Sequence, residues 1–574
     1  MSSLDWWVIG VYFLGLALVV WWSSRQQQTA ADYFLAGRNV GWFAIGGSLF
    51  ASNIGSEHIV GLAGSGAASG MAMAHWEMHA WIMLMLGWIF VPFYYRAGVF
   101  TMPEFLEKRF NSEVRWILSL VSLVAYVFTK VSVTVYAGAL VFQTLLPDME
   151  LTLLGTVWGP FWIGAFATVI LTGVYTVFGG FRAVLYTDAV QAILLLVGSV
   201  SITWIGLQSL GGWDVLVEMA RERSDELALW RPLVVEGSDI PWWKNGDFPW
   251  LGILIASPII GIWYWCTDQY IVQRTLAAKN LTMARRGAIW GSFLKVWPVL
   301  IFLLPGIIGW ALHQKGIIHI PMKSQGGTAM DIDGDQVFAT MVIQLLPAGL
   351  RGLVVGGLLA ALMSSLSSLF NSCATLFTVD IYEKVFPDRS ERHLVGVGRV
   401  ATTVIVLLGM CWIPVMYRIS DGGIYQYLQS VQGYLAPPIT AVFLLGLFWS
   451  RVNANGAKWG LIVGFVLGMA KLAIQAQFST LDESKQAAPA ILAAIGDLNF
   501  LYASGCLFLL SIAVVVLASL ITDRPDAASL KGLTFSHLDH QEIRSTAEKV
   551  DYGLTAVTLA LVIGMYLYFS FWLR

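Results

Sequence analysis

Residues Trp42 to Gly61 read WFAIGGSLFASNIGSEHIVG. Both ends of this stretch are apolar, and its length suits a membrane-spanning helix of about 20 residues. Its middle does not suit lipid, because the polar and glycine-containing run from Asn53 to His58 falls where the bilayer midplane would lie. Backbone polar groups at that depth need partners inside the protein, since hydrocarbon offers none. The stretch therefore predicts a helix that is broken beside a buried cavity.

The composition is that of a polytopic membrane protein. Of the 574 residues, 57% are hydrophobic and only 12% are charged, whereas soluble domains carry about 25% charged residues. The formal net charge of −2 gives no indication of nucleic-acid binding. No disulfide or cysteine metal site is expected, because the four cysteines lie in apolar segments without metal-type spacing.

Apolar runs of roughly 20 residues predict an all-α fold with about 14 transmembrane helices. The first run lacks a basic start and a cleavage site, so it is expected to be a retained helix. The approximate limits are 5–24, 42–70, 76–97, 115–144, 155–178, 184–209, 248–272, 284–312, 350–382, 394–417, 423–449, 457–476, 497–522 and 551–573.

The orientation of the chain follows from its basic loops. Lys and Arg recur in the loops after spans 1, 3, 5, 7, 9 and 11, for example at Arg38, Arg96 and Arg182. The alternate short loops are poorer in these residues. The positive-inside rule places the basic loops in the cytoplasm, so both termini are predicted outside it.

A second interrupted helix is predicted within 248–272, where Pro258, Gly261, Thr267 and Asp268 weaken a continuous helix. The two breaks, in spans 2 and 7, are five spans apart, which is the spacing of an inverted repeat of five helices. The predicted divisions are an extra N-terminal helix and cytoplasmic loop at 1–41, a first repeat at 42–209, an extracellular loop at 210–247, a second repeat at 248–449, and three peripheral helices at 450–574 with a cytoplasmic linker at 523–550.

Small residues in span 9 form one candidate ion site. Ala361, Ser364, Ser365 and Ser368 have the spacing i, i+3, i+4, i+7, which is one helical face. Hydroxyls together with carbonyls freed by a broken helix would suit a hard cation such as sodium. The alternative is helix packing, since small residues recur at membrane helix contacts. The serine face alone favours packing, and a broken span 2 opposite it favours the ion site.

Ionisable residues deep in the membrane are functional candidates. Glu77 and Lys295 are expected to pair and to bind hydroxyls, and Gln429 adds an amide with a donor and an acceptor. Lys130 is assigned to snorkelling or a structural pair. Asp188 is either part of an ion pathway or a cap at the start of span 6.

This set of polar residues suits a neutral, hydroxyl-rich ligand such as a sugar. It consists of Glu77, Lys295 and Gln429, together with Asn53, His58 and neighbouring aromatic residues. The alternative for the acid, base and amide is a set of buried pairs that hold a helix bundle together.

Other classes of function find less support in the sequence. His75, Glu77 and His79 spell H-x-E-x-H, but no third convergent metal ligand is evident. The hydrolase motifs G-x-S-x-G and H-E-x-x-H are missing, so no enzyme is predicted. A sensor would carry a soluble signalling domain, for which the tail after Arg524 is too short.

From Asp32 to Asp523 the sequence resembles the solute:sodium symporter family and, within it, the sodium/glucose cotransporters. The motifs that carry the resemblance occur in order. They are DYFLAGR at Asp32, SLFASNIGSEH at Ser48, GLAGSGAASG at Gly61, MPEFLEKRF at Met102, YTD at Tyr186, WYWCTDQYIVQR at Trp263, SSLSSLFNS at Ser364, TLFTVDIY at Thr375 and APPITAVFLLGLFW at Ala436.

The resemblance implies a LeuT-type core and sodium-driven import of a hexose such as glucose or galactose, with another polyol such as myo-inositol as the alternative. It implies a sugar site of Asn53, His58, Glu77, Tyr264, Trp265, Lys295 and Gln429, with Tyr264 as the inner gate. It implies a sodium site of Ala51, Ile54, Ala361, Ser364 and Ser365, and in some members a second sodium site at Asp188, Ser364, Ser367 and Ser368.

The implied partners are the hexose, the co-transported sodium ion and the lipid bilayer of the plasma membrane (the inner membrane of the cell), with no nucleic acid and no obligatory protein partner. Some positions depart from the sugar carriers. Gly261 stands where they often place Thr or Asn, and Glu57 and His79 replace less polar residues. These departures leave the exact sugar open.

Overall fold

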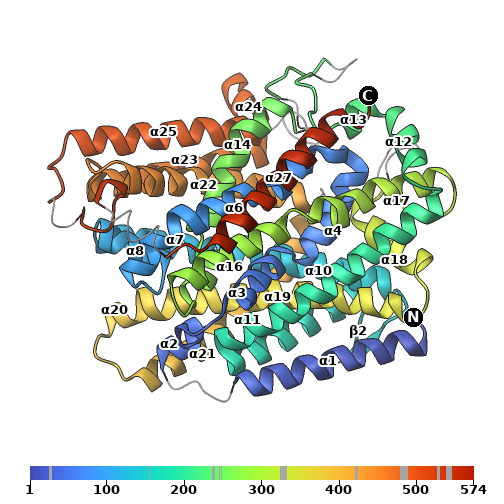
Figure 1. Cartoon of the computed structure of the whole chain (residues 1–574), viewed down its shortest axis with the longest axis horizontal. Coiled ribbons are helices and arrows are strands. Elements are labelled where there is room, and N and C mark those ends of the chain that lie inside the picture. The colour runs from blue at the N-terminus through green and yellow to red at the C-terminus, as the bar shows by residue number, and fades with distance from the viewer. Residues whose placement is uncertain are drawn as a thin grey trace.

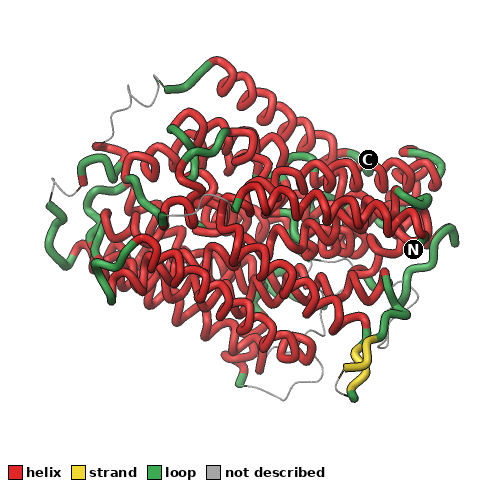
Figure 2. The backbone as a smooth tube through the Cα atoms, turned by 90° about the horizontal axis from the view of Figure 1, so that it is seen from below, coloured by secondary structure: helices red, strands yellow, loops and turns green. Residues whose placement is uncertain are grey.

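The computed structural model describes residues 1–574 except 25–28, 154, 235–238, 245, 247, 323–331, 420–423, 479–488, 527–529 and 538–545. The described chain is almost wholly helical, and Figure 2 shows one small hairpin at the edge of the bundle. The hairpin pairs β1 (Leu151–Leu153) with β2 (Thr156–Trp158) in antiparallel register, with Leu151 opposite Trp158. The expectation of an all-α fold therefore holds apart from this turn.

The helices follow one another along the chain with few long connections. In the N-terminal part they are α1 (Ser3–Ser23), α2 (Ala30–Leu35), α3 (Trp42–Asn53), α4 (Ser56–Ser69), α5 (Ala74–Glu77), α6 (Ala80–Met85), α7 (Val91–Ala97), α8 (Met102–Arg109), α9 (Ser112–Ala125), α10 (Ser132–Leu145), α11 (Pro160–Leu210), α12 (Trp213–Arg221) and α13 (Ser224–Leu227). In the C-terminal part they are α14 (Trp250–Ile262), α15 (Gln269–Leu276), α16 (Leu281–Lys295), α17 (Leu304–Gln314), α18 (Val337–Leu345), α19 (Leu350–Thr375), α20 (Glu383–Val385), α21 (Glu391–Ile419), α22 (Ile424–Phe448), α23 (Ala454–Phe478), α24 (Ala490–Asp497), α25 (Phe500–Leu520) and α27 (Lys549–Phe571).

Several of these helices continue into one another through wider or tighter turns. The π-helical segments are Leu86–Phe90, Tyr126–Val131, Trp263–Thr267, Val299–Leu303 and Leu376–Tyr382, and the 3₁₀ segments are Ala36–Arg38, Gly70–Met73, Gly334–Gln336 and Phe535–His537.

Twelve helical stretches in the described residues are long and apolar enough to cross a membrane. One of them, Pro160–Leu210, covers two of the spans expected from the sequence and contains Gly180 in a non-helical conformation. The total of 14 spans stays a prediction, as does the division into two inverted repeats.

The interruption in span 2 lies between α3 and α4. Ile54 has φ −92° and ψ 78°, which leaves the helical region, and Gly55 precedes the first residue of α4. This is the polar run from which the sequence predicts a break. The interruption exposes backbone groups of both half-helices to the interior of the protein, where side chains can bond to them.

The second interruption differs from the expectation. The helix α14 continues through Pro258 and Gly261, passes into the π-helical segment Trp263–Thr267, and ends at Asp268, whose ψ is 126°. Membrane helices tolerate such residues where neighbouring elements compensate for them. Pro258 and Gly261 therefore do not break this span, and the Asp268 carboxylate caps α15 by accepting from the backbone N–H of Tyr270.

Helices from distant parts of the sequence touch through glycine. A Cβ added to Gly306 of α17 would lie 1.9 Å from the carbonyl oxygen of Ala63 on α4, and one on Gly66 would lie 2.3 Å from that of Leu303. The absence of side chains here allows two backbones to approach as closely as membrane helices do at small-residue contacts. The helix after the first break is thus held against the second half of the chain.

The arrangement places the central helices between two outer layers (Figure 1). The helix α1 packs on α11 and α19, while α23 and α25 pack on α22 at the opposite side, and α27 crosses α16. Figure 1 also shows both termini at one end of the molecule, with α2, α8 and α20 at the other end. The peripheral position predicted for the last three long helices stays a prediction.

Candidate functional site

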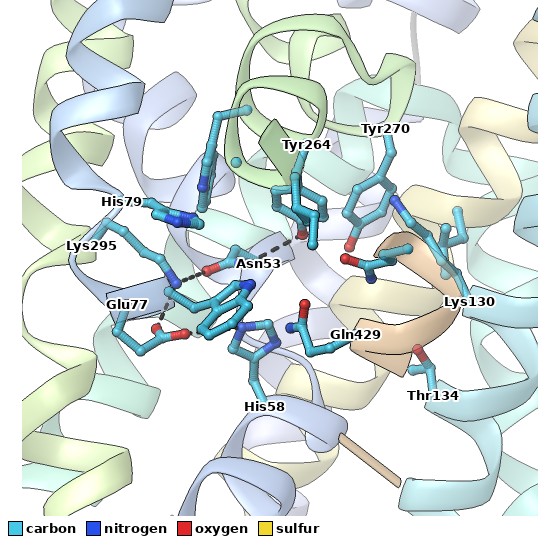
Figure 3. Close-up of a pocket in the computed structure, with 16 residues that line it drawn as sticks. Asn53, His58, Glu77, His79, Lys130, Thr134, Tyr264, Tyr270, Lys295 and Gln429 are labelled. Atoms are coloured by element: carbon cyan, nitrogen blue, oxygen red, sulfur yellow. Dashed lines mark hydrogen bonds and ion pairs between the residues drawn. The ribbon is translucent and has the colours of Figure 1, made fainter. Parts of the chain in front are cut away.

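One buried pocket lies beside both helix interruptions (Figure 3). It receives side chains from α3, α4, α5, α10, α14, α15, α16, α19 and α22 and from the π-helical segments Tyr126–Val131 and Trp263–Thr267. All seven residues predicted for the sugar line it, although they come from segments far apart in the sequence. They are Asn53, His58, Glu77, Tyr264, Trp265, Lys295 and Gln429.

A chain of polar contacts runs along one wall of the pocket. Lys295 Nζ donates to Glu77 Oε2 at 2.5 Å and to Asn53 Oδ1 at 2.7 Å. Asn53 Nδ2 in turn donates to the Tyr264 hydroxyl at 3.2 Å, and His58 Nε2 lies 3.4 Å from Glu77 Oε1. The expected Glu77–Lys295 pair is therefore present, and it orients the amide of Asn53 at the end of α3.

Two buried acceptor atoms in this pocket are incompletely satisfied. Gln429 Oε1 has no hydrogen-bond donor among the described residues, whereas Glu77 Oε1 lies 3.4 Å from His58 Nε2. Glu77 is 0% exposed and Gln429 is 4% exposed. A buried acceptor without a donor costs about 1–3 kcal/mol. The pocket is therefore suited to a ligand that brings hydrogen-bond donors to these two oxygens.

Aromatic rings surround the second cation of the pocket. Lys130 Nζ lies 4.9 Å from the ring centre of Tyr264 and 4.8 Å from that of Tyr270, and it donates to Asp268 Oδ2 at 2.5 Å. Of the two roles assigned to Lys130 from the sequence, the structure shows the structural pair. Because Asp268 ends the second interrupted helix, the pair ties the π-helical segment Tyr126–Val131 to that interruption.

Several pocket residues fall outside the set assigned to the sugar. Trp76, His79, Lys130, Thr134 and Tyr270 all line the cavity. Lys130 could be found from its charge in an apolar run, and His79 from its place beside Glu77. Nothing local in the sequence distinguishes the others, because their position depends on how each helix is rotated against its neighbours.

The residues predicted for sodium lie on α3, at its C-terminal boundary and on α19, and these two helices pack against each other. Ala51, Ile54, Ala361 and Ser364 are 0% exposed, and Ser365 Oγ donates to the carbonyl oxygen of Ser52 at 3.3 Å. The oxygens that these residues offer as ligands are hydroxyl and carbonyl oxygens, and hard cations bind to such oxygens. The chemistry of these oxygen ligands therefore fits a sodium ion held by residues of these two helices.

Asp188 does not cap the start of its helix. Its carboxylate accepts hydrogen bonds from three hydroxyls, at 2.7 Å from Ser48, 2.9 Å from Ser52 and 2.6 Å from Ser364. The capping alternative raised by the sequence is therefore wrong, because these donors come from α3 and α19 and not from the backbone of α11.

A buried arginine accompanies the residues predicted for a second sodium. Arg274 Nη2 lies 3.6 Å from Asp188 Oδ2 and donates to Ser368 Oγ at 2.5 Å, while Ser367 Oγ donates to the carbonyl oxygen of Ser364 at 2.9 Å. The sequence reasoning missed Arg274. A guanidinium beside Asp188 offsets the negative charge that a second cation would use.

Comparison with known proteins places the chain among membrane transporters. The model of the Sodium:solute symporter family matches residues 33–464. Rabbit (Oryctolagus cuniculus) Sodium/glucose cotransporter 1 is 37% identical over 566 residues, covering 94% of this chain and 82% of the relative. Human (Homo sapiens) Sodium/myo-inositol cotransporter 2 is 38% identical over 545 residues, covering 92% and 78%.

Two solved structures share the fold. A Na⁺-coupled sialic acid symporter gives a TM-score of 0.73 at 21% identity, covering 92% of this chain and 99% of that one. A nucleobase-cation-symport-1 family transporter gives 0.51 at 15% identity, covering 90% and 99%. These likenesses establish the predicted LeuT-type architecture. With the family match over most of its length, the chain belongs to the sodium:solute symporter family.

Proposed function

We propose that this protein is a sodium-coupled symporter that imports a neutral, hydroxyl-rich solute, a hexose such as glucose or galactose. The observation that carries the proposal is the buried acceptor Gln429 Oε1, which has no donor among the described residues and lines the same pocket as the Glu77 carboxylate. Sugar hydroxyls supply such donors, and the rings of Tyr264 and Trp265 offer apolar surface for the sugar ring.

The charges of the pocket favour a neutral solute. Glu77 is paired with Lys295, and Lys130 is paired with Asp268. In this buried site each of these charges is already paired. A charged solute would therefore meet no unpaired opposite charge to offset the free-energy cost of removing its own charge from water. A hydroxyl-rich solute needs hydrogen bonds only, and the paired groups retain lone pairs and protons for them.

Myo-inositol is the second candidate, because it presents the same kind of hydroxyls on a ring of similar size. The rabbit relative is named for glucose and the human relative for myo-inositol. Their sequence identities to this chain are nearly equal, at 37% and 38%. The pocket chemistry alone accepts either ring. The coupling ion is the same in both cases.

Sodium coupling is proposed to use the α3–α19 site, with the carbonyl oxygens of Ala51, Ile54 and Ala361 and the hydroxyls of Ser364 and Ser365. Because this site includes the end of α3, sodium binding would fix the half-helix whose last residue, Asn53, reaches the sugar pocket. A second sodium at Asp188, Ser367 and Ser368 would have to compete with Arg274.

The protein is proposed to act as a transporter and not as an enzyme, in the plasma membrane (the inner membrane of the cell), with both termini outside the cytoplasm. The position of both ends of the chain at one end of the molecule supports termini on the same side (Figure 1).

Counterflow in proteoliposomes tests the proposal. Purified protein is reconstituted, the vesicles are loaded with unlabelled glucose, galactose or myo-inositol, and entry of the labelled solute is followed with sodium and with potassium. We expect sodium-dependent exchange for at least one of the three. Equal entry in both salts would contradict the coupling, and no entry of any of them would contradict the solute class.

A further inference from the structure

A glycine faces an imidazole across one wall of the pocket. Gly261 lies in the last turn of α14, and His79 immediately precedes α6, and both line the cavity. A Cβ built on Gly261 would come within 2.9 Å of His79 Cε1 and 2.4 Å of Ile82 Cδ1. The histidine ring therefore occupies the space that a side chain at position 261 would need.

The ring of His79 is held by the same face of α14. His79 Nε2 lies 2.6 Å from Ser257 Oγ, and Ser257 precedes Gly261 by four residues, so both face the same side of the helix. His79 is 3% exposed. One hydrogen bond thus ties the imidazole to α14, at a position where Gly261 presents no side chain against it.

The other ring nitrogen, Nδ1, lies 3.0 Å from the position of a Cβ on Gly261. Among the described residues, His79 Nδ1 makes no hydrogen bond. With Nε2 engaged by Ser257, Nδ1 is a donor or an acceptor according to the tautomer. A hydroxyl group can satisfy it in either state. Figure 3 shows His79 at the same end of the pocket as Lys295 and Glu77, and Lys130 and Thr134 at the other end.

We propose that His79, given room by Gly261 and oriented by Ser257, is a specificity-determining residue that binds one hydroxyl of the transported ring polyol. This inference rests on the proposed function and refines it. The His79 ring narrows the pocket next to α14, and its Nδ1 selects solutes that place a hydroxyl there. A site built to hydrogen-bond a hydroxyl discriminates strongly against a solute that lacks it, because a buried group is then left unpaired.

Variants at the two positions test the steric part. Gly261→Ala should lower the apparent affinity for the transported polyol by about tenfold or more, since the new methyl group displaces the ring. His79→Ala should remove the nitrogen and enlarge the pocket. In the double variant H79A/G261A the methyl group no longer meets a ring, so its affinity should equal or exceed that of G261A and not fall by the product of both losses.

Monodeoxy solutes test the hydrogen bond. In the wild type, the monodeoxy sugar that lacks the hydroxyl facing His79 should compete about tenfold less well than its parent. In His79→Ala the same deoxy sugar and its parent should compete equally, while the other deoxy sugars keep their wild-type ratios. Ser257→Ala, which frees the ring without removing it, should shift the same ratio in the same direction by a smaller factor.

Controls separate specificity from folding. Leu254→Ala changes the half-exposed outer face of α14 and should leave every ratio unchanged. Sodium-dependent tryptophan fluorescence without sugar reports whether each variant retains its sodium site. If His79→Ala is not recovered folded, His79→Phe keeps the ring volume and removes both nitrogens, and the same loss of discrimination is expected.

Two failures are distinguishable. Wild-type protein that transports none of the polyols with sodium would overturn the proposed function and this inference with it. Sodium-driven uptake in the wild type, combined with unchanged deoxy-sugar ratios in folded His79 variants, would overturn the role of His79 alone. A double variant that loses the product of both single effects would overturn the steric role of Gly261.

Discussion

Lys295 Nζ lies 2.5 Å from Glu77 Oε2 although the two residues are far apart in the chain, at the end of α16 and the end of α5. The same ammonium also donates to Asn53, the last residue of α3. One cation therefore connects the broken helix to the acid of the pocket. We expect a solute that binds to either group to act on the position of α3, which also contributes to the proposed sodium site.

The sugar site is tested first by a change that leaves every charge in place. Gln429→Ala removes an amide whose Oε1 has no donor among the described residues, so the loss should appear in solute binding more than in folding. We expect the apparent sugar affinity to fall about tenfold, which corresponds to about 1.4 kcal/mol. Initial uptake rates over a range of sugar concentrations measure it. Gln208→Ala, at an exposed glutamine of α11, is the matched control.

The acid and base of the pocket should respond in the same direction. Glu77→Gln keeps the shape of the side chain but provides a weaker acceptor, and Lys295→Ala removes a donor. Each leaves a buried charge without its partner, which costs about 3–5 kcal/mol, so thermal stability is measured beside sugar affinity. Unchanged sugar binding in both variants and in Gln429→Ala would contradict the pocket as the sugar site.

The sodium site is tested at Ser365. Ser365→Ala removes one hydroxyl, which donates to Ser52 at 3.3 Å, and barely changes the volume of the side chain. We expect sodium-driven uptake to collapse while the protein remains folded. The half-maximal sodium concentration and the maximal uptake are measured, with Ser201→Ala as a control, because that hydroxyl bonds within its own helix. Wild-type values for both quantities would place the ion elsewhere.

The number of coupled ions is tested at Asp188. A charge that crosses 100 mV gains about 2.3 kcal/mol, so two sodium ions would support a far steeper sugar gradient than one. Reversal-potential measurements on reconstituted protein give the coupling ratio. A ratio of two that falls towards one in Asp188→Asn would support a second site, and a ratio of one in the wild type would end the proposal. Because Arg274 lies beside Asp188, Asp188→Asn should also lower thermal stability.

The glycine contact between α4 and α17 predicts a stability effect without a change in site chemistry. Gly306→Ala places a methyl group 1.9 Å from the carbonyl oxygen of Ala63, and both atoms belong to helix backbones that cannot yield separately. We expect the free energy of unfolding to fall by about 1–3 kcal/mol or more, or the variant to fail to fold. Gly564→Ala on α27 meets no atom within 4 Å and should be neutral. Thermal unfolding of the two variants in detergent decides the point.

The sequence alone determined the helical architecture and singled out seven residues that line one pocket. A chain of apolar runs can satisfy its backbone in lipid only as helices, and the polar run from Asn53 to His58 can lie at that depth only if the helix is interrupted beside protein. The pairing of Glu77 with Lys295 followed from the same reasoning, because a deeply buried acid and base each need a partner.

Only the tertiary structure decided which atoms meet. The helices of the core are apolar on nearly all sides, so their sequences carry little information about rotation and depth. Arg274 beside Asp188, His79 in the space left by Gly261, and an α14 that continues through Pro258 all depend on those two quantities. The packing of helices from distant parts of the chain fixes them, and so it decides which polar atoms face the pocket and which are already paired.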